Sequence, residues 1–208
     1  MPVSAMLKIE DLACVRDDRV LFEHLSLSLE GGQMLLVEGR NGSGKTSLLR
    51  LLTGLKLADE GDILWQGESI TQLRADYYEQ MNYIGHHDGV KRELTCLENL
   101  RLAQAMGKPA DIELDDALER VNLFRYGDTP VSNLSAGQTR RLALARLIVT
   151  ESKLWILDEP FTSLDKKSMA YFEGLFEQHL QQQGLLVMTS HHDIAMSGSN
   201  IQRLDLSA

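Results

Sequence analysis

Residues 39–46 read "GRNGSGKT", and this stretch decides the fold. It matches the pattern G-x-x-x-x-G-K-[ST] of a phosphate-binding loop. The apolar run "MLLV" at 34–37 precedes it and predicts a strand of a parallel sheet that is buried on both faces. Leucines at helical spacing follow it, at Leu48, Leu51, Leu52 and Leu55. The order strand, loop, helix predicts a nucleotide site at the start of an α/β domain.

In a loop of this kind, the backbone N–H groups and the helix N-terminus cradle phosphates. Lys45 would bring its charge to the terminal phosphates and take part in catalysis, and the Thr46 hydroxyl would bind Mg²⁺. A chance match to so short a pattern is the alternative, but the predicted strand and helix on either side argue against it. The predicted nucleotide-binding residues of the loop are Gly39, Arg40, Asn41, Gly42, Ser43, Gly44, Lys45, Thr46 and Ser47.

A second pattern, "LWILDEP" at 154–160, consists of four apolar residues followed by two carboxylates. Open α/β sheets bind their ligands at the carboxyl ends of such strands. We expect Asp158 to hold the hydration shell of Mg²⁺, and Glu159 to polarise the attacking water as general base. The alternative is a plain surface turn before Pro160.

A third candidate follows the apolar run "LLVMTS" at 185–190. His191 lies directly after this predicted strand and could contact the terminal phosphate and sense its loss. His192 is the competing choice, and we prefer His191 because it lies nearer the strand end. A metal site built from 86–87 and 191–192 is disfavoured, because adjacent histidines chelate one ion poorly and no cluster of Cys or carboxylate accompanies them.

Composition limits the classes of protein that the chain could represent. It has 208 residues and a net charge of −9, from 21 Lys and Arg against 30 Asp and Glu, which argues against nucleic acid as a partner. The length suits one domain with an inserted lobe. Cys14 and Cys96 have no CxxC spacing, so we expect buried or idle free thiols in a reducing compartment. Neither a signal segment nor about 18 consecutive apolar residues occurs, so we expect a soluble cytoplasmic protein that could dock on a membrane protein.

The remaining sequence predicts two layers of strands and a helical lobe. Segments 7–12 and 20–29 indicate an antiparallel opening, since both have β-type patterns and the second ends at the turn Gly31-Gly32. A helical lobe is expected over about 93–150, interrupted at Gly107 and Pro109. Trp65 and Trp155 are assigned to packing. Alternating helices and strands predict a parallel sheet; the further segments are strands at 62–67, 81–85, 154–157 and 185–190, and helices at 136–150 and up to about 183.

The stretch "NLSAGQTRR" at 133–141 predicts a helix start. Ser135 and Gln138 have the spacing of a capping box, which satisfies two backbone donors. Gly137 does not fit a plain helix, because glycine there costs about 1 kcal/mol relative to alanine. We therefore expect something to approach this backbone closely.

These motifs, in this order over nearly the whole chain, resemble those of the ATP-binding cassette (ABC) ATPases. "LSAGQ" at 134–138 resembles their signature motif, usually LSGGQ, and "FTSLD" at 161–165 resembles their D-loop. The resemblance implies an α/β P-loop core with a parallel sheet, an antiparallel β subdomain and the inserted helical lobe. Residues 1–208 would form a single ATP-binding domain.

The resemblance also implies a homodimer that binds ATP and Mg²⁺ between its subunits. Ser135, Gly137 and Gln138 of one subunit would then cap the γ-phosphate held by the other subunit. Asp165 would help to join the two sites across the interface.

Two positions depart from the family pattern. His87 stands where the family has a glutamine between the core and the helical lobe, which would make contacts with Mg²⁺ and water sensitive to pH near neutrality. The family stacks an aromatic residue on adenine shortly before the phosphate loop, and "CVRDDRVLF" at 14–22 has no Tyr there. Arg16 or Phe22 could substitute.

More narrowly, segments such as "LLRLLTGL" and "ELTCLENLRL" resemble the ATPases of cytochrome c maturation, which are haem exporters. This resemblance implies transport-coupled ATP hydrolysis with an integral membrane permease as partner. It places the protein peripherally on the cytoplasmic face of the bacterial inner membrane, without direct insertion and without nucleic acid. Alternatives are an ABC ATPase for another substrate, a soluble ABC ATPase acting on ribosomes or DNA, and a regulatory module without turnover, against which Glu159 argues.

Overall fold

The computed structural model describes residues 6–190 and 200–207, and its central sheet has five parallel strands in the order β11-β3-β10-β9-β6. The predicted parallel sheet is therefore confirmed. The edge strand β11 was not predicted, because its half-exposed pattern is short. The strands are β3 Gln33–Glu38, β6 Met81–Ile84, β9 Leu154–Asp158, β10 Leu185–Thr189 and β11 Asn200–Asp205.

A second, antiparallel sheet has the order β2-β1-β4-β5 and confirms the predicted opening of the chain. Asp17 and Asp18 form the two-residue turn between its first strands, and both have positive φ, as a type I′ hairpin requires. This turn brings Arg16 and Arg19 to the hairpin tip. The strands are β1 Leu7–Arg16, β2 Arg19–Leu29, β4 Glu60–Trp65 and β5 Glu68–Ser69.

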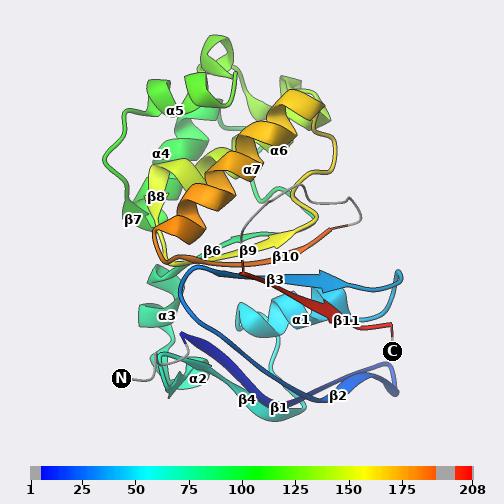
Figure 1. The fold of residues 1–208 in the computed structure, drawn as a ribbon. Coiled ribbons are helices and arrows are strands. Elements are labelled where there is room, and N and C mark those ends of the chain that lie inside the picture. The colour runs from blue at the N-terminus through cyan, green and yellow to red at the C-terminus, as the bar shows by residue number, and fades with distance from the viewer. Residues whose placement is uncertain (1–5, 191–199, 208) are drawn as a thin grey trace.

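Helices cover both faces of the parallel sheet. Helix α1, Lys45–Leu52, lies between the two sheets, and the longer helices lie on the opposite face (Figure 1). Among the described residues, no helix combines the length and apolar character needed to cross a bilayer. The other helices are α2 Ile70–Leu73, α3 Ala75–Glu79, α4 Cys96–Met106, α5 Leu114–Arg120, α6 Ala136–Val149 and α7 Lys166–Gln181; a short ribbon pairs β7 Lys108–Pro109 with β8 Thr150–Glu151.

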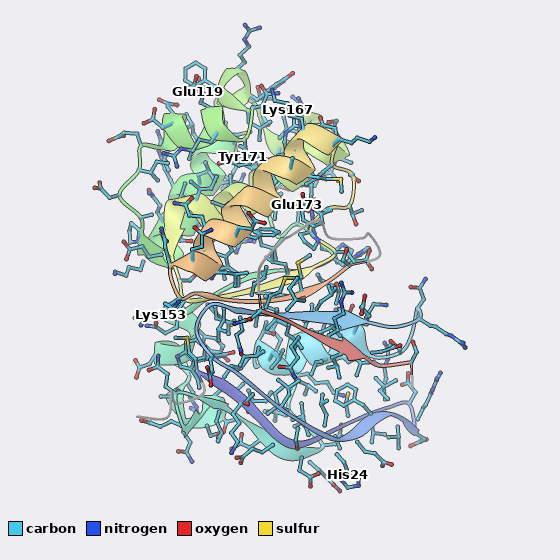
Figure 2. The ribbon with its side chains drawn as sticks, viewed as in Figure 1. His24, Glu119, Lys153, Lys167, Tyr171 and Glu173 are labelled. Carbon is cyan, nitrogen blue, oxygen red and sulfur yellow. The ribbon has the colours of Figure 1, made fainter. Side chains whose placement is uncertain are left out.

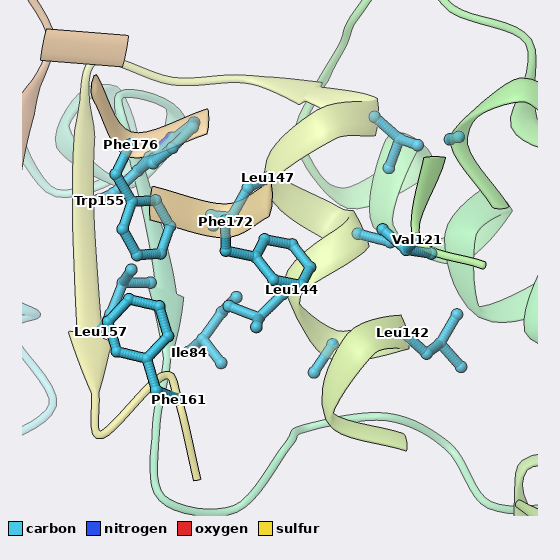
Figure 3. Close-up of a cluster of buried hydrophobic side chains, with 14 of the residues drawn as sticks. Ile84, Val121, Leu142, Leu144, Leu147, Trp155, Leu157, Phe161, Phe172 and Phe176 are labelled. Carbon is cyan, nitrogen blue, oxygen red and sulfur yellow. The ribbon is translucent and has the colours of Figure 1, made fainter. Parts of the chain in front are cut away.

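Alternate residues of the central strands enter two separate cores, as the two-residue period of a strand requires. Trp155 and Leu157 face the core that Phe172 and Phe176 of α7 complete (Figure 3), whereas Leu154 and Ile156 face α1. The predicted packing roles of both tryptophans and the buried free thiols of both cysteines are confirmed.

His179 is a buried polar side chain near the C-terminal end of α7. Lys167 and Glu173 lie on the same helix (Figure 2). The ring of His179 stacks on that of Trp155 with centroids 3.8 Å apart, and its Nε2 lies 3.1 Å from the carbonyl oxygen of Leu185. Burial lowers the pKa of His179 from 6.5 to about 4. The imidazole is therefore neutral in the folded protein at neutral pH.

Acidification should destabilise the fold through His179. The unfolded chain binds this proton near pH 6.5 and the folded chain only near pH 4, so stability is full above pH 6.5 and falls as pH decreases. The expected loss from this group at pH 4 is about 3 kcal/mol. Urea unfolding between pH 7 and pH 4 should give a flatter profile for His179→Gln than for the wild type. The exposed His24→Gln is the matched control, and an equally flat profile for it would contradict the assignment.

Candidate functional site

The predicted phosphate loop joins the carboxyl end of β3 to the first turn of α1. Gly39 and Gly44 have φ values of 138° and 105°, in the region that favours glycine. A Cβ on Gly44 would also lie 3.2 Å from Cβ of Leu21. No side chain caps α1, and its first turn has no acidic residue. Its first backbone N–H groups therefore form an anion-binding end.

Two side chains of the loop are poised for an anion. Lys45 is only 8% exposed, and its Nζ donates to the carbonyl oxygens of Gly39 at 2.7 Å and Arg40 at 3.3 Å. The buried hydroxyl of Ser43 has no hydrogen-bond partner among the described residues. Because an unpaired buried hydroxyl costs free energy, a ligand oxygen at this loop would stabilise it.

Asp158 lies at the carboxyl end of β9 and is 2% exposed. Its Oδ2 accepts a hydrogen bond from the hydroxyl of Thr46 at 2.9 Å, and its Oδ1 accepts one from the hydroxyl of Thr189 at 2.7 Å. The structure therefore brings together the two predicted Mg²⁺ residues, although 112 positions separate them. A hydroxyl and a carboxylate are the hard oxygen ligands that suit this ion.

Glu159 follows directly and has a φ of 49°, which is unusual for a residue with a side chain. Its N–H donates to the hydroxyl of Thr189 at 2.8 Å. Glu159 also lines a hollow of about 550 Å³ that the phosphate loop and the β1–β2 hairpin enclose. The predicted base, the loop lysine and the hairpin arginines Arg16 and Arg19 thus face one space.

The predicted capping box begins α6. The N–H of Gln138 donates to Oγ of Ser135 at 3.3 Å, and the N–H of Ser135 donates to Oε1 of Gln138 at 2.8 Å. The Ser135 hydroxyl acts as acceptor here, so its own hydrogen remains available to a ligand. Ser135 is exposed on the surface.

Comparison of the sequence with models of known families identifies the family to which this chain belongs. The model of the family described as "ABC transporter" matches residues 22–162, more than half of the chain. The chain belongs to the ABC transporter family. The match includes the phosphate loop, the signature motif and the two carboxylates of 158–159, so the protein is an ATP-binding ABC ATPase.

This ABC ATPase is similar over almost its full length to proteins named "Cytochrome c biogenesis ATP-binding export protein CcmA". The identity is 46% with the Aliivibrio fischeri protein, covering 97% of this chain and 99% of the relative. It is 49% with the Methylococcus capsulatus protein, covering 98% and 99%. A solved structure of a putative ABC transporter ATP-binding protein from Pyrococcus furiosus, 23% identical, has a TM-score of 0.81 with 96% of both chains covered, which supports the predicted fold.

The backbone group that lies close to Gly137 in this ABC ATPase belongs to the same chain. A Cβ on Gly137 would lie 2.7 Å from the carbonyl oxygen of Ser163, in the D-loop. The expectation of a close backbone neighbour is confirmed. Ser163 already leaves no room for a side chain here, so the glycine by itself does not require a nucleotide held by a second copy. The contact of Gly137 with nucleotide stays a prediction.

Other predicted residues of the ABC ATPase have structural partners. Asp165 caps the N-terminus of α7, accepting from the N–H of Ser168 at 2.7 Å. That hydrogen bond lowers the pKa of the Asp165 carboxyl. Arg16 lines the hollow beside the phosphate loop, whereas the ring of Phe22 lies against Gly44; a contact of either with adenine stays a prediction.

The roles predicted for the histidines stay predictions. His87 is exposed in the segment after β6, with its ring 5.7 Å from that of His86. His191 and His192 lie outside the described residues, so the predicted phosphate contact stays a prediction. Within the described ranges, no group of three or more His, Cys, Asp or Glu is placed to hold a metal ion.

Sequence reasoning missed two residues that organise the site of this ABC ATPase. Thr189 joins Asp158 to Glu159 through its hydroxyl, and Arg140 is 4% exposed beneath the same turn. The position of Thr189 at the end of an apolar strand was a usable signal. The sequence around Arg140 contains no such signal, because an arginine in a helix is ordinarily a surface residue.

Proposed function

We propose that this chain is the ATP-hydrolysing subunit of a bacterial haem exporter for cytochrome c maturation. It would act as a homodimer on an integral membrane permease, at the cytoplasmic face of the inner membrane, with residues 1–208 as one ATP-binding unit. The near full-length similarity to proteins named as cytochrome c biogenesis export proteins carries the proposal. The site geometry supports the hydrolysis that such a subunit performs.

In this proposal the phosphate loop binds ATP through the N–H groups of α1. Lys45 would leave its carbonyl partners for the terminal phosphates, and Ser43 would gain a partner. Thr46 and Asp158 would hold Mg²⁺, which supplies charge neutralisation to the phosphates. Glu159 would accept a proton from water as the water oxygen bonds to the γ-phosphorus. The bond from that phosphorus to the β–γ bridging oxygen breaks, releasing ADP and phosphate.

The second half of each site would come from the partner subunit. The hydroxyl of Ser135 and the amides of Ala136 and Gly137 stand at the exposed end of α6, where the helix dipole favours an anion. The capping box uses the amides of Ser135 and Gln138 instead. The two functions of this helix end are therefore compatible.

Nucleotide would close the dimer against a net repulsion. Each subunit carries a charge of −9, although salt screens exposed charges beyond about 8 Å. Charge-assisted hydrogen bonds to the γ-phosphate contribute about 1.5–3 kcal/mol each. Several of them would close the dimer, and hydrolysis would remove them.

The base of the nucleotide would meet a guanidinium where the family stacks an aromatic ring. Arg16 lies at the hairpin tip on the wall of the nucleotide hollow, and Arg19 lies across the turn. A guanidinium stacks on the face of any nucleobase. We therefore expect weak discrimination between ATP and GTP.

The permease would dock in a groove between the core and the helical lobe. The groove has a volume of about 550 Å³, and it includes three apolar side chains that are strongly exposed. These are Met106, Leu55 and Tyr78, at 81%, 68% and 49% exposure. Apolar surface of this kind favours a protein partner. The groove also includes Gly89, so an occupant would touch the segment that carries His87.

Copurification tests the proposal. The tagged chain, expressed in its source bacterium and extracted from membranes with mild detergent, should bring down a cytochrome c maturation permease identified by mass spectrometry. Met106→Glu should lower that recovery about tenfold or more, because it places a charge in an apolar contact. Its ATPase activity should stay within about twofold of the wild type.

Phe124→Glu is the matched control, because Phe124 is 57% exposed on the lobe but lies outside the groove. It should leave permease recovery intact. Recovery of a different permease would contradict the haem-export assignment, and equal losses in the two variants would contradict the groove.

A further inference from the structure

Arg140 of α6 holds the turn that carries Glu159. Its Nε lies 3.1 Å from the carbonyl oxygen of Pro160. Its Nη2 lies 2.8 Å from the carbonyl oxygens of both Asp158 and Glu159. One buried side chain therefore fixes three consecutive peptide groups at the end of β9.

The same guanidinium holds the segment after β6. Its Nη1 donates to the carbonyl oxygen of Gly85 at 3.1 Å and to Oδ1 of Asp88 at 2.9 Å. These two residues flank His86 and His87 in the sequence. The exposed histidine pair is thus anchored on both sides to the group that holds the Glu159 turn.

The backbone of Glu159 depends on these contacts. A residue with a side chain stays at positive φ only where its surroundings enforce that conformation. Here the hydroxyl of Thr189 accepts from the Glu159 N–H, and Arg140 donates to the Glu159 carbonyl. Both peptide groups of the residue are therefore held, which fixes the position of its Cα and the direction in which its side chain leaves the backbone.

The choice of arginine indicates a geometric task. A planar guanidinium can direct its N–H groups at five acceptors at once, which lysine cannot do. Among the described residues, Asp88 is the only carboxylate that pairs with Arg140, and its side chain is 26% exposed. Core stability alone favours a well-packed apolar side chain over a buried charge.

We propose that Arg140 is a positioning residue that fixes the Glu159 turn and the His86–His87 segment to α6, the helix that begins in the signature motif (the signature helix), of the same subunit. The inference rests on the proposed function, in which Glu159 is the general base and the first turn of α6 meets the partner's ATP. Ser135 and Arg140 lie about 7.5 Å apart along one helix. Seating of that helix end on nucleotide would thereby set the position of the subunit's own base.

Steady-state kinetics of Arg140→Gln test the role. We expect kcat to fall about ten- to hundredfold, since misplacement of a base by about 1 Å has an effect of this size. KM for ATP and the dissociation constant of the bound nucleotide should change by about twofold or less, because the phosphate loop is untouched. Arg140→Lys, which keeps the positive charge beside Asp88, should show a smaller loss that is again confined to kcat.

Mixed dimers separate positioning from general destabilisation. In a dimer with one Glu159→Gln subunit, only the other subunit has a working base. Arg140→Gln in the subunit with the working base should lower turnover about ten- to hundredfold. Arg140→Gln in the Glu159→Gln subunit should change turnover by about twofold or less, whereas a loss of folding would act from both sides.

Equal losses in the two mixed dimers would overturn the positioning role, as would a kcat of Arg140→Gln within about twofold of the wild type. Failure of the proposed function has a different signature. In that case Glu159→Gln alone would keep its turnover, whatever residue stands at position 140.

Discussion

Glu159→Gln should bind ATP as tightly as the wild type and hydrolyse it about 10²- to 10⁴-fold more slowly, the usual size of a general-base contribution. Glutamine keeps the shape of the side chain but cannot accept the proton of the attacking water. The contacts that hold residue 159, from Thr189 and Arg140, involve only its backbone and should survive. Phosphate release and equilibrium binding of a fluorescent ATP analogue measure the two quantities separately.

The same variant should accumulate as an ATP-bound dimer, because the contacts that close the dimer would form and not be removed. Analytical ultracentrifugation with and without ATP and Mg²⁺ provides the readout. Glu173→Gln on the outside of α7 is the matched control and should behave as the wild type (Figure 2). A Glu159→Gln protein that sediments as a monomer with ATP would contradict the dimer, and one with full turnover would contradict the base.

Ser135→Arg should lower turnover about 10²- to 10³-fold, as loss of a donor to developing charge does, and leave nucleotide binding intact. The bulky side chain would block the approach of the α6 end to the partner's γ-phosphate. It would also remove the capping box, at a cost of about 0.5–2 kcal/mol. ATPase assays and binding titrations on the purified variant check both expectations.

Two further variants show whether the loss at position 135 is functional. Ser135→Asp keeps a good N-cap but directs a negative charge at the phosphate, so it should fold normally and also lose turnover. Ser132→Arg makes the same charge change at an exposed residue three positions earlier and should be active. Full activity of both residue-135 variants would remove the proposed role of this helix end.

Mixing inactive subunits tests whether the site is shared. Lys45→Ala cannot hold phosphate, and Ser135→Arg cannot complete the partner's site. A mixed dimer of the two variants contains one intact site, formed by Lys45 of the Ser135→Arg subunit and Ser135 of the Lys45→Ala subunit. Activity should therefore reappear on mixing and reach at most about half that of the wild type. Absence of any recovery in a verified mixed dimer would indicate sites that are complete within one chain.

The parts of the fold that the sequence predicts are those that local patterns specify. A two-residue alternation marks β1 and β2, an unbroken apolar run marks β3, β9 and β10, and capping residues mark the start of α6. The last strand, β11, was missed because its side chains are mostly exposed and its apolar residues are few.

The residues of the site also fall into those that a local motif reveals and those that only the folded structure reveals. Lys45, Thr46 and Asp158 were found because each belongs to a contiguous motif at a strand end. Arg140 contacts residues up to 55 positions away, and no local pattern reports such a contact. Gly137 shows the same limit, because its neighbour Ser163 could be identified only after the chain had folded.

The close approach of the Ser163 carbonyl to Gly137 has a mechanical consequence. In the proposed dimer, each subunit presents its D-loop and the start of its signature helix to the partner subunit. No side chain separates these two stretches where Gly137 meets Ser163. Because the two backbones are in contact at this point, a push on one stretch toward the other is transmitted directly. Closure of the dimer would then engage both as one rigid body, so a single added methyl group at position 137 should disturb both contacts at once.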